Sequence, residues 1–281
     1  MEFKIAMVQA LTHLGPDEEE INIARAEAYI DEAADKGARL VCFPESFPGP
    51  WRDDNIYSPL EKMKAKAAQR KIYLICGDLE PVGDDENGFY NIFWLIGPDG
   101  EVVGKYRRTT PLGPWIYKGG KYWDFNYKTG DELPVFDIGD VKIGILMCSE
   151  SYCTELGRAL ALQGAEIIFY PAGVTRKAMW ETWSTLIKAR AFENNAFTAV
   201  SKNMFGDAGD GFCIVAGPEG TLYESQEPGV HIVTLDLARM RWLRSTTEDG
   251  FHEILPYNAK PGALTQFRRP ELFEKILASK K

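Results

Sequence analysis

The sequence lacks several features that mark whole classes of protein. No apolar run approaches the roughly 18 residues that a membrane-spanning helix requires, so no membrane partner is expected. The five cysteines are odd in number and show no Cys-x-x-Cys spacing, which argues against a disulfide framework and against a metal site of the zinc type. Lysine and arginine total 32 against 41 acidic residues. A net charge of −9 without a basic stripe argues against a nucleic-acid partner.

The opening segment does not predict a secretory leader. Residues 1–10 run directly into a strand-like pattern, with neither a charged n-region nor a long apolar core, so a cytoplasmic location is expected. No repeat or low-complexity linker divides the chain. With 45% hydrophobic and 26% charged residues, the composition is that of an ordinary globular protein. A chain of 281 residues can bury a core that needs no disulfide or metal.

Short apolar runs alternate with helix-length amphipathic segments, which predicts one layered α/β domain over residues 1–245. The expected strands are 3–10, 39–43, 72–76, 91–96, 101–108, 142–148, 166–170, 197–203, 212–216 and 230–236. The expected helices are 21–36, 59–70, 154–163 and 180–194. Gly-Pro turns at 97–100 and 217–220 indicate tight connections, the first of them a β-hairpin. Residues 246–281 are polar and contain proline, which predicts an extended arm packing on the domain or on a partner subunit.

Three strands end in a residue suited to chemistry. These residues are Glu45, Arg108 and Cys148, each preceded by an apolar run. Ligand sites of α/β sheets gather at the carboxyl ends of strands, so the three side chains are expected to converge on one edge.

Cys148 lies between an expected strand and an expected helix, where a helix dipole would favour the nucleophilic thiolate. The alternative is a small buried hydrophobe, the interpretation we give to the other four cysteines. Glu45 stands between Phe43 and Phe47, and such partial desolvation would raise its pKa into the range of a general base. Its alternative is a capping or surface glutamate.

The motifs around these residues resemble a known family. FPESF at 43–47, GKYRR at 104–108 and GILMCSE at 144–150 resemble, in order, the three catalytic motifs of the nitrilase/amidase (carbon–nitrogen hydrolase) superfamily. The resemblance continues through nearly the whole chain, in segments 161–173, 188–195, 211–220 and 267–273. The Cys-x-Glu form at 148–150 looks closer to the nitrilase branch.

The resemblance implies a four-layer α-β-β-α sandwich that assembles as a homodimer or higher homo-oligomer through helices flanking the nucleophile segment. It implies hydrolysis of a small-molecule nitrile or non-peptide amide, with no cofactor and no metal. Glu45 would deprotonate Cys148, which attacks the carbon of the C–N group and forms a thioester. Water would then release the acid. A neighbouring cation would stabilise the tetrahedral intermediate.

The chain departs from the family at two positions. Where the family motif ends in lysine, this sequence has Arg108, which keeps the charge but is longer and planar. Lys105 is a poor substitute, because strand alternation puts residues 105 and 108 on opposite faces. The family's second glutamate has no obvious counterpart, and Asp124 is the candidate for its place. Glu150 is a further candidate supporting residue.

Aromatic residues are dense between 115 and 127, and they predict a preference for arylaliphatic or medium-sized apolar substrates. The candidate substrate-binding residues are Trp51, Trp115, Trp123 and Trp180. Packing in the core or between subunits is the alternative role for these rings. Two other functions remain open: a catalytically impaired family member acting as a binding or scaffold protein, and a redox protein, which would lack the usual Cys-x-x-Cys pair.

Overall fold

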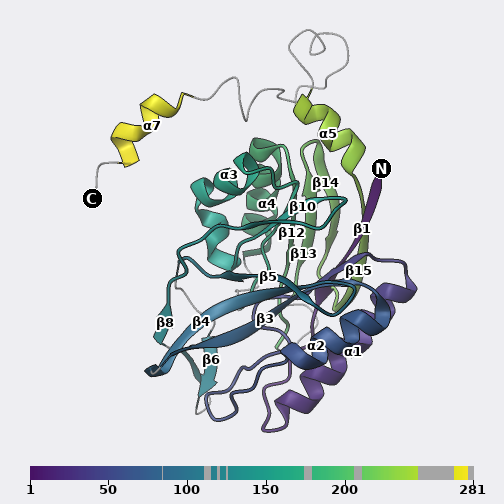
Figure 1. The fold of residues 1–281 in the computed structure, drawn as a ribbon, viewed down its shortest axis with the longest axis vertical. Coiled ribbons are helices and arrows are strands. Elements are labelled where there is room, and N and C mark those ends of the chain that lie inside the picture. The colour runs from purple at the N-terminus through teal and green to yellow at the C-terminus, as the bar shows by residue number, and fades with distance from the viewer. Residues whose placement is uncertain are drawn as a thin grey trace.

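The computed structural model describes residues 1–83, 85–110, 115–118, 121–124, 126–173, 179–205, 211–245 and 269–277. In this part of the chain two β-sheets lie between two layers of helices (Figure 1). None of the helices within these ranges is long and apolar enough to cross a membrane.

The first sheet has the strand order β15-β1-β2-β3-β4-β5, with β8 paired to β4, in the described residues. Its strands are β1 Glu2–Gln9, β2 Leu40–Cys42, β3 Tyr73–Val82, β4 Asp85–Ile96, β5 Val102–Arg107, β8 Asn126–Lys128 and β15 Gly229–Asp236. Strands β1, β2 and β3 are parallel, whereas β4 and β5 form the hairpin expected around residues 97–100. Helices α1 Glu18–Asp35 and α2 Leu60–Arg70 pack on one face.

The second sheet has the order β14-β13-β12-β11-β10-β9 in the same described ranges. Its strands are β9 Val135–Asp137, β10 Lys142–Ile145, β11 Ile167–Phe169, β12 Phe197–Ser201, β13 Cys213–Gly217 and β14 Gly220–Ser225. The central three, β10, β11 and β12, are parallel. Its outer helices are α3 Thr154–Leu162 and α4 Trp180–Asn194, and α5 Leu237–Ser245 follows β15.

Side-chain alternation along β1 accounts for the four layers. Phe3, Ile5 and Met7 face the second sheet and join the large core between the sheets. Ala6 and Val8 point the other way, into a second core against α1 and α2. Because both faces of this sheet are covered, its central strands are continuous apolar runs. The predicted α-β-β-α sandwich is therefore confirmed.

Most predicted elements are present within two or three residues, and α4 has its expected bounds. The segment around Cys148 differs: β10 ends at Ile145, and a short 3-10 helix, η1 Cys148–Tyr152, precedes α3. The small hairpin β6 Trp115–Lys118 with β7 Lys121–Asp124 was not expected. Of the predicted arm, helix α7 Pro270–Leu277 is described, while 246–268 and 278–281 lie outside the described residues.

Candidate active site

The three strand-end residues expected to converge do lie together. Glu45 follows β2, Arg108 follows β5, and Cys148 begins η1 beyond β10. The Arg108 Nη1 donates to Glu45 Oε1 at 2.8 Å, and the thiol of Cys148 hydrogen-bonds to the Glu45 carboxylate. Glu45 and Arg108 are 2% and 1% exposed, so this is a buried ion pair with a half-buried cysteine beside it. Isolated buried charges are costly, and each of these two compensates the other.

Several further groups hold Glu45 in place. Asn91, on β4, donates its Nδ2 to Glu45 Oε1 at 3.0 Å, and the Gly173 amide also donates to the carboxylate. Asn203 donates to the Glu45 backbone carbonyl. Gly173 has no room for a side chain, because a Cβ there would lie 2.7 Å from Glu45 Oε2. Glu45 is thus held by contacts from three other segments of the fold, two of them to its carboxylate and one to its backbone.

Burial raises the pKa of Glu45, although the Arg108 charge and hydrogen bonds from Cys148, Asn91 and Gly173 oppose the shift. A raised carboxyl pKa suits a group that must accept a proton and later return it. Phe43 and Phe47, which flank Glu45 in the sequence, are both fully buried, and their rings belong to the core beside α1 and α2.

The thiol of Cys148 does not match the sequence-based expectation. Burial, followed by the negative charge of Glu45, raises its pKa to about 12, and Arg108 only partly opposes this. The expected stabilisation of a thiolate by a helix dipole is therefore wrong, because a single short 3-10 turn follows the cysteine and desolvation outweighs it. Cys148 also has φ of 44°, a left-handed conformation that costs energy in a non-glycine residue. A thiol pKa of about 12 favours the protonated form of Cys148 near neutral pH.

Arg108 bridges Glu45 and the turn that begins at Cys148. Its Nη2 donates to Ser149 Oγ at 2.7 Å while its Nη1 is on Glu45, so the planar guanidinium is oriented at two points. Burial acts to lower the pKa of Arg108, but the negative charges around it, with Glu45 as the largest, together outweigh burial and raise that pKa. A fixed, permanently charged donor lies next to the thiol.

Lys105 takes no part in this cluster. It pairs with Glu80, and Arg107 pairs with the same carboxylate at 2.7 Å. The prediction that residues 105 and 107 share a face opposite Arg108 is confirmed, because Arg108 is buried while both of these side chains are partly exposed.

The candidate aromatic wall is only partly described. Trp51 is fully buried. The centroid of its ring lies 4.9 Å from the centroid of the Phe205 ring, in an edge-on contact. Trp180 is half-buried and packs edge-on against Phe212 at 6.0 Å. Trp115, Trp123 and Asp124 lie in the β6–β7 hairpin, and their side chains are outside the described residues. Their roles in substrate binding and support stay predictions.

Glu150 lies two residues after Cys148, with no exposed surface. It accepts hydrogen bonds from both the segment after Arg108 and the residue before Cys148. Among the described residues, no group of three or more His, Cys, Asp or Glu side chains could hold a metal ion.

Sequence reasoning missed four groups of the site. They are Asn91, Ser149, the Gly173 amide and Asn203. Asn91 had a usable signal, because the predicted hairpin puts it across from Arg108, whose N–H donates to the Asn91 carbonyl at 2.9 Å. Asn203 and Gly173 also follow apolar strands, the rule that identified Glu45. Only the tertiary structure reveals that Gly173 contacts the Glu45 carboxylate and that Asn203 donates to the Glu45 backbone carbonyl.

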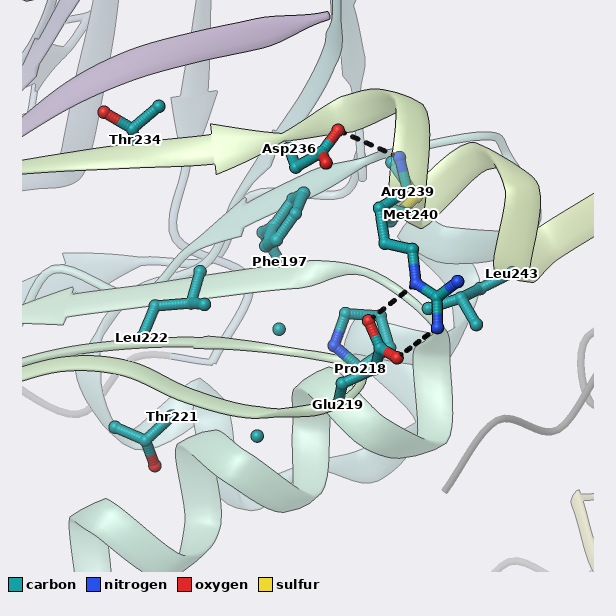
Figure 2. A pocket seen from close by; sticks show the side chains of 12 residues that line it. Phe197, Pro218, Glu219, Thr221, Leu222, Thr234, Asp236, Arg239, Met240 and Leu243 are labelled. Carbon is teal, nitrogen blue, oxygen red and sulfur yellow. Dashed lines mark hydrogen bonds and ion pairs between the residues drawn. The ribbon is translucent and has the colours of Figure 1, made fainter. Parts of the chain in front are cut away.

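A separate hollow lies between the β13–β14 turn and α5 (Figure 2). Arg239 reaches across it to Glu219, with its Nη2 2.6 Å from Oε1, and its backbone N–H donates to Asp236. None of Glu45, Arg108 and Cys148 lines this hollow. Within the hollow, the charge of Arg239 is compensated by that of Glu219, and we assign no chemistry to the hollow.

Comparison with known proteins identifies the family of this chain. A family model described as carbon-nitrogen hydrolase matches residues 4–245. Nitrilase homolog 2 of Dictyostelium discoideum is 30% identical to this chain in a match that covers 70% of this chain. The match spans 62% of that relative's length. The omega-amidase NIT2 of Homo sapiens is 28% identical over 71% of this chain and 74% of its own.

Solved structures share the fold. One is an amidase from Nesterenkonia sp. AN1 carrying the acetamide moiety of fluoroacetamide on its active-site cysteine. It is 22% identical, with a TM-score of 0.75 over 98% of this chain and 97% of its own. A carbon-nitrogen hydrolase from Helicobacter pylori G27 gives a TM-score of 0.78 at 17% identity over the full length of both chains.

The fold is that of the enzymes that act on carbon–nitrogen bonds. The family match covers most of the chain, and this protein belongs to the carbon–nitrogen hydrolase family, within the nitrilase superfamily.

Proposed function

We propose that this protein hydrolyses the carbon–nitrogen bond of a small non-peptide amide through a thioester on Cys148, with Glu45 as general base and Arg108 as cationic stabiliser. The observation that carries the proposal is the buried contact among these three side chains. An amide is favoured over a nitrile because several relatives are named amidases.

Each proton in the proposed reaction has a donor and an acceptor. Glu45 takes the proton of the Cys148 thiol as the sulfur attacks the carbonyl carbon, and the carbonyl oxygen becomes an oxyanion. Arg108 stabilises that negative charge. Glu45 then passes its proton to the nitrogen, the C–N bond breaks, and ammonia or an amine leaves the thioester.

The second half repeats these roles with water. Glu45 accepts a proton from a water molecule while the oxygen of that water attacks the thioester carbon. The oxyanion again forms beside Arg108. Collapse breaks the C–S bond, and the proton held by Glu45 returns to the sulfur. The carboxylic acid leaves, so the enzyme regains its starting state.

The test is ammonia release from acetamide, succinamate, phenylacetamide and phenylacetonitrile, with a matched pair of cysteine variants. Cys148→Ala should lose at least about 1,000-fold in kcat, since without the nucleophile only oxyanion binding remains. Cys153→Ala, at the other half-buried cysteine, should stay near wild type. Substantial turnover by a folded Cys148→Ala variant would assign the nucleophile elsewhere.

The same panel tests the substrate class. The aromatic-rich segment supports a higher kcat/KM for phenylacetamide, whereas the omega-amidase names of relatives make succinamate its strongest competitor. A clear preference for succinamate or acetamide would mean that the aromatic rings are structural.

A further inference from the structure

Glu150 makes more hydrogen bonds than a turn residue needs. Its Oε1 accepts from the backbone N–H groups of Thr109 at 2.9 Å and Thr110 at 3.1 Å. The same oxygen accepts the Thr109 hydroxyl at 2.7 Å and the Thr110 hydroxyl at 3.4 Å. Its Oε2 accepts the Tyr106 hydroxyl and the Met147 N–H, both at 2.7 Å. An ionised carboxylate only accepts, so six converging donors match its chemistry.

The donors come from the two segments that carry the proposed chemistry. Tyr106 and Thr109 flank Arg108 at the end of β5 in the first sheet. Met147 immediately precedes Cys148, beyond β10 in the second sheet. One carboxylate therefore joins the backbone around the cation to the backbone around the nucleophile, across the space between the two sheets.

No direct contact with the reacting groups is involved. The atoms that Glu150 touches belong to residues within two positions of Arg108 or Cys148 in sequence, and its negative charge also acts on Arg108 through space. A charge-assisted bond in a buried place is stronger than one between neutral groups, so this carboxylate can hold two strand ends in register.

We infer that Glu150 is a positioning residue that sets the distance between Arg108 and Cys148 by clamping the end of β5 to the nucleophile turn. The inference rests on the proposed function for its effect on turnover. Misplacing a catalytic group by about 1 Å can lower a rate about 100-fold. Loss of the clamp should therefore act on kcat rather than on substrate affinity.

The experiment compares Glu150→Gln with Glu166→Gln. Glu166 is also a buried carboxylate of the second-sheet region, which accepts the Lys142 N–H at 3.0 Å and pairs with Arg241 at 2.6 Å. Neither of these two partners of Glu166 lies in the segments around Arg108 and Cys148. Both substitutions keep side-chain size and replace one acceptor by a donor.

Two rates are measured well below the thermal midpoint of each variant: amide turnover, and alkylation of Cys148 by iodoacetamide followed by mass spectrometry. Glu150→Gln should lower kcat about 100-fold with KM within about threefold, and should slow alkylation about tenfold. Glu166→Gln should lower the thermal midpoint and leave both rates near wild type. Wild-type rates in Glu150→Gln, or equal losses in both variants, would overturn the inference.

A gentler pair covers the case in which Glu150→Gln does not fold. Thr109→Val removes one hydroxyl donor with little change of shape, and Thr109→Ser keeps it. The valine variant should lose about fivefold in kcat and in alkylation rate, and the serine variant should recover it; identical rates would refute the clamp. Alkylation needs no substrate, so a wild-type enzyme inactive on every amide would remove the proposed function while the alkylation rates still decide the clamp.

Discussion

Arginine at position 108 is the most unusual single residue of the site. Its guanidinium donates to Glu45 and Ser149 at once, a two-point orientation that one ammonium group could not reproduce in the same plane. The family's lysine motif alone would not have indicated Ser149 as its second partner.

Arg108→Ala should lower kcat about 100- to 1,000-fold, roughly 3–4 kcal/mol of transition-state stabilisation, because an oxyanion donor is lost. Arg108→Lys should recover part of that loss, since the charge returns without the planar fork. Lys105→Ala is the matched control and should affect stability only, because Lys105 pairs with Glu80. Steady-state kinetics measure this; an essential Lys105 with a dispensable Arg108 would reverse the assignment.

The pKa of Glu45 should determine the acid limb of the pH–rate profile. The carboxylate must be ionised to accept the thiol proton, so kcat/KM should rise with pH as Glu45 loses its proton. Burial raises that pKa above its ordinary value of 4.5, and the thiol pKa of about 12 keeps Cys148 protonated across this range. A profile of kcat/KM from acid to neutral pH should place the acid limb above 4.5. An acid limb at or below 4.5 would mean that another group is the base.

At the scale of an element, the first turn of α1 carries a second buried carboxyl group. Glu18 has no exposed surface and accepts the Trp51 N–H at 3.4 Å, which ties the start of α1 to the segment after the Glu45 motif. Burial raises the pKa of Glu18 to about 7, since hydrogen bonds from that segment and the Arg52 charge only partly oppose it.

This shift has a definite sign for stability. The folded state binds the Glu18 proton more tightly than the unfolded state, so the contribution is fully present below about pH 4.5 and is lost as pH rises through about 7. Between pH 5 and pH 8, a shift of this pKa from 4.5 to about 7 removes about 2–3 kcal/mol of stability by linkage. Urea unfolding measures the free energy of unfolding at pH 5 and at pH 8. Between these two pH values that free energy should fall less for Glu18→Gln than for the wild-type protein. The exposed Glu19→Gln serves as the control; an equal fall in all three proteins would exclude Glu18 as the source.

At the scale of the whole molecule, the exposed face of α4 is the place where we expect a second copy of the chain to bind. A shallow hollow there is lined by Tyr152, Glu181, Thr182, Thr185, Leu186 and Ala189. Tyr152 is 47% exposed, and it lies directly in η1, so an interface on this face would cover the nucleophile segment.

Light scattering should give the mass of a dimer or larger homo-oligomer. Thr185→Glu, which adds a charge to this face, should shift the protein toward monomers by at least tenfold in the dissociation constant. Gln69→Glu adds the same charge to the exposed face of α2 and should leave the mass unchanged. A wild-type monomer, or equal dissociation in both variants, would contradict the expected interface.

The sequence by itself determined the layered α/β fold, the identity of Glu45, Arg108 and Cys148 as the strand-end candidates, and the solvent-facing role of Lys105. These follow from local rules, because apolar periodicity and strand alternation depend on neighbours only a few residues away. Strand 101–108 and its hairpin with 91–96 were found in this way.

Only the tertiary structure decided the electrostatics and the supports of the site. The protonated state of Cys148 depends on burial and on a carboxylate about 100 residues away, which no local pattern encodes. Glu150 binds Thr110 and Thr109, which lie 40 and 41 residues away in the sequence, and Asn203 binds Glu45 across 158 residues. Such contacts arise when two sheets pack face to face. The free energy of that packing depends on residues throughout the core, so no single segment of the sequence determines it.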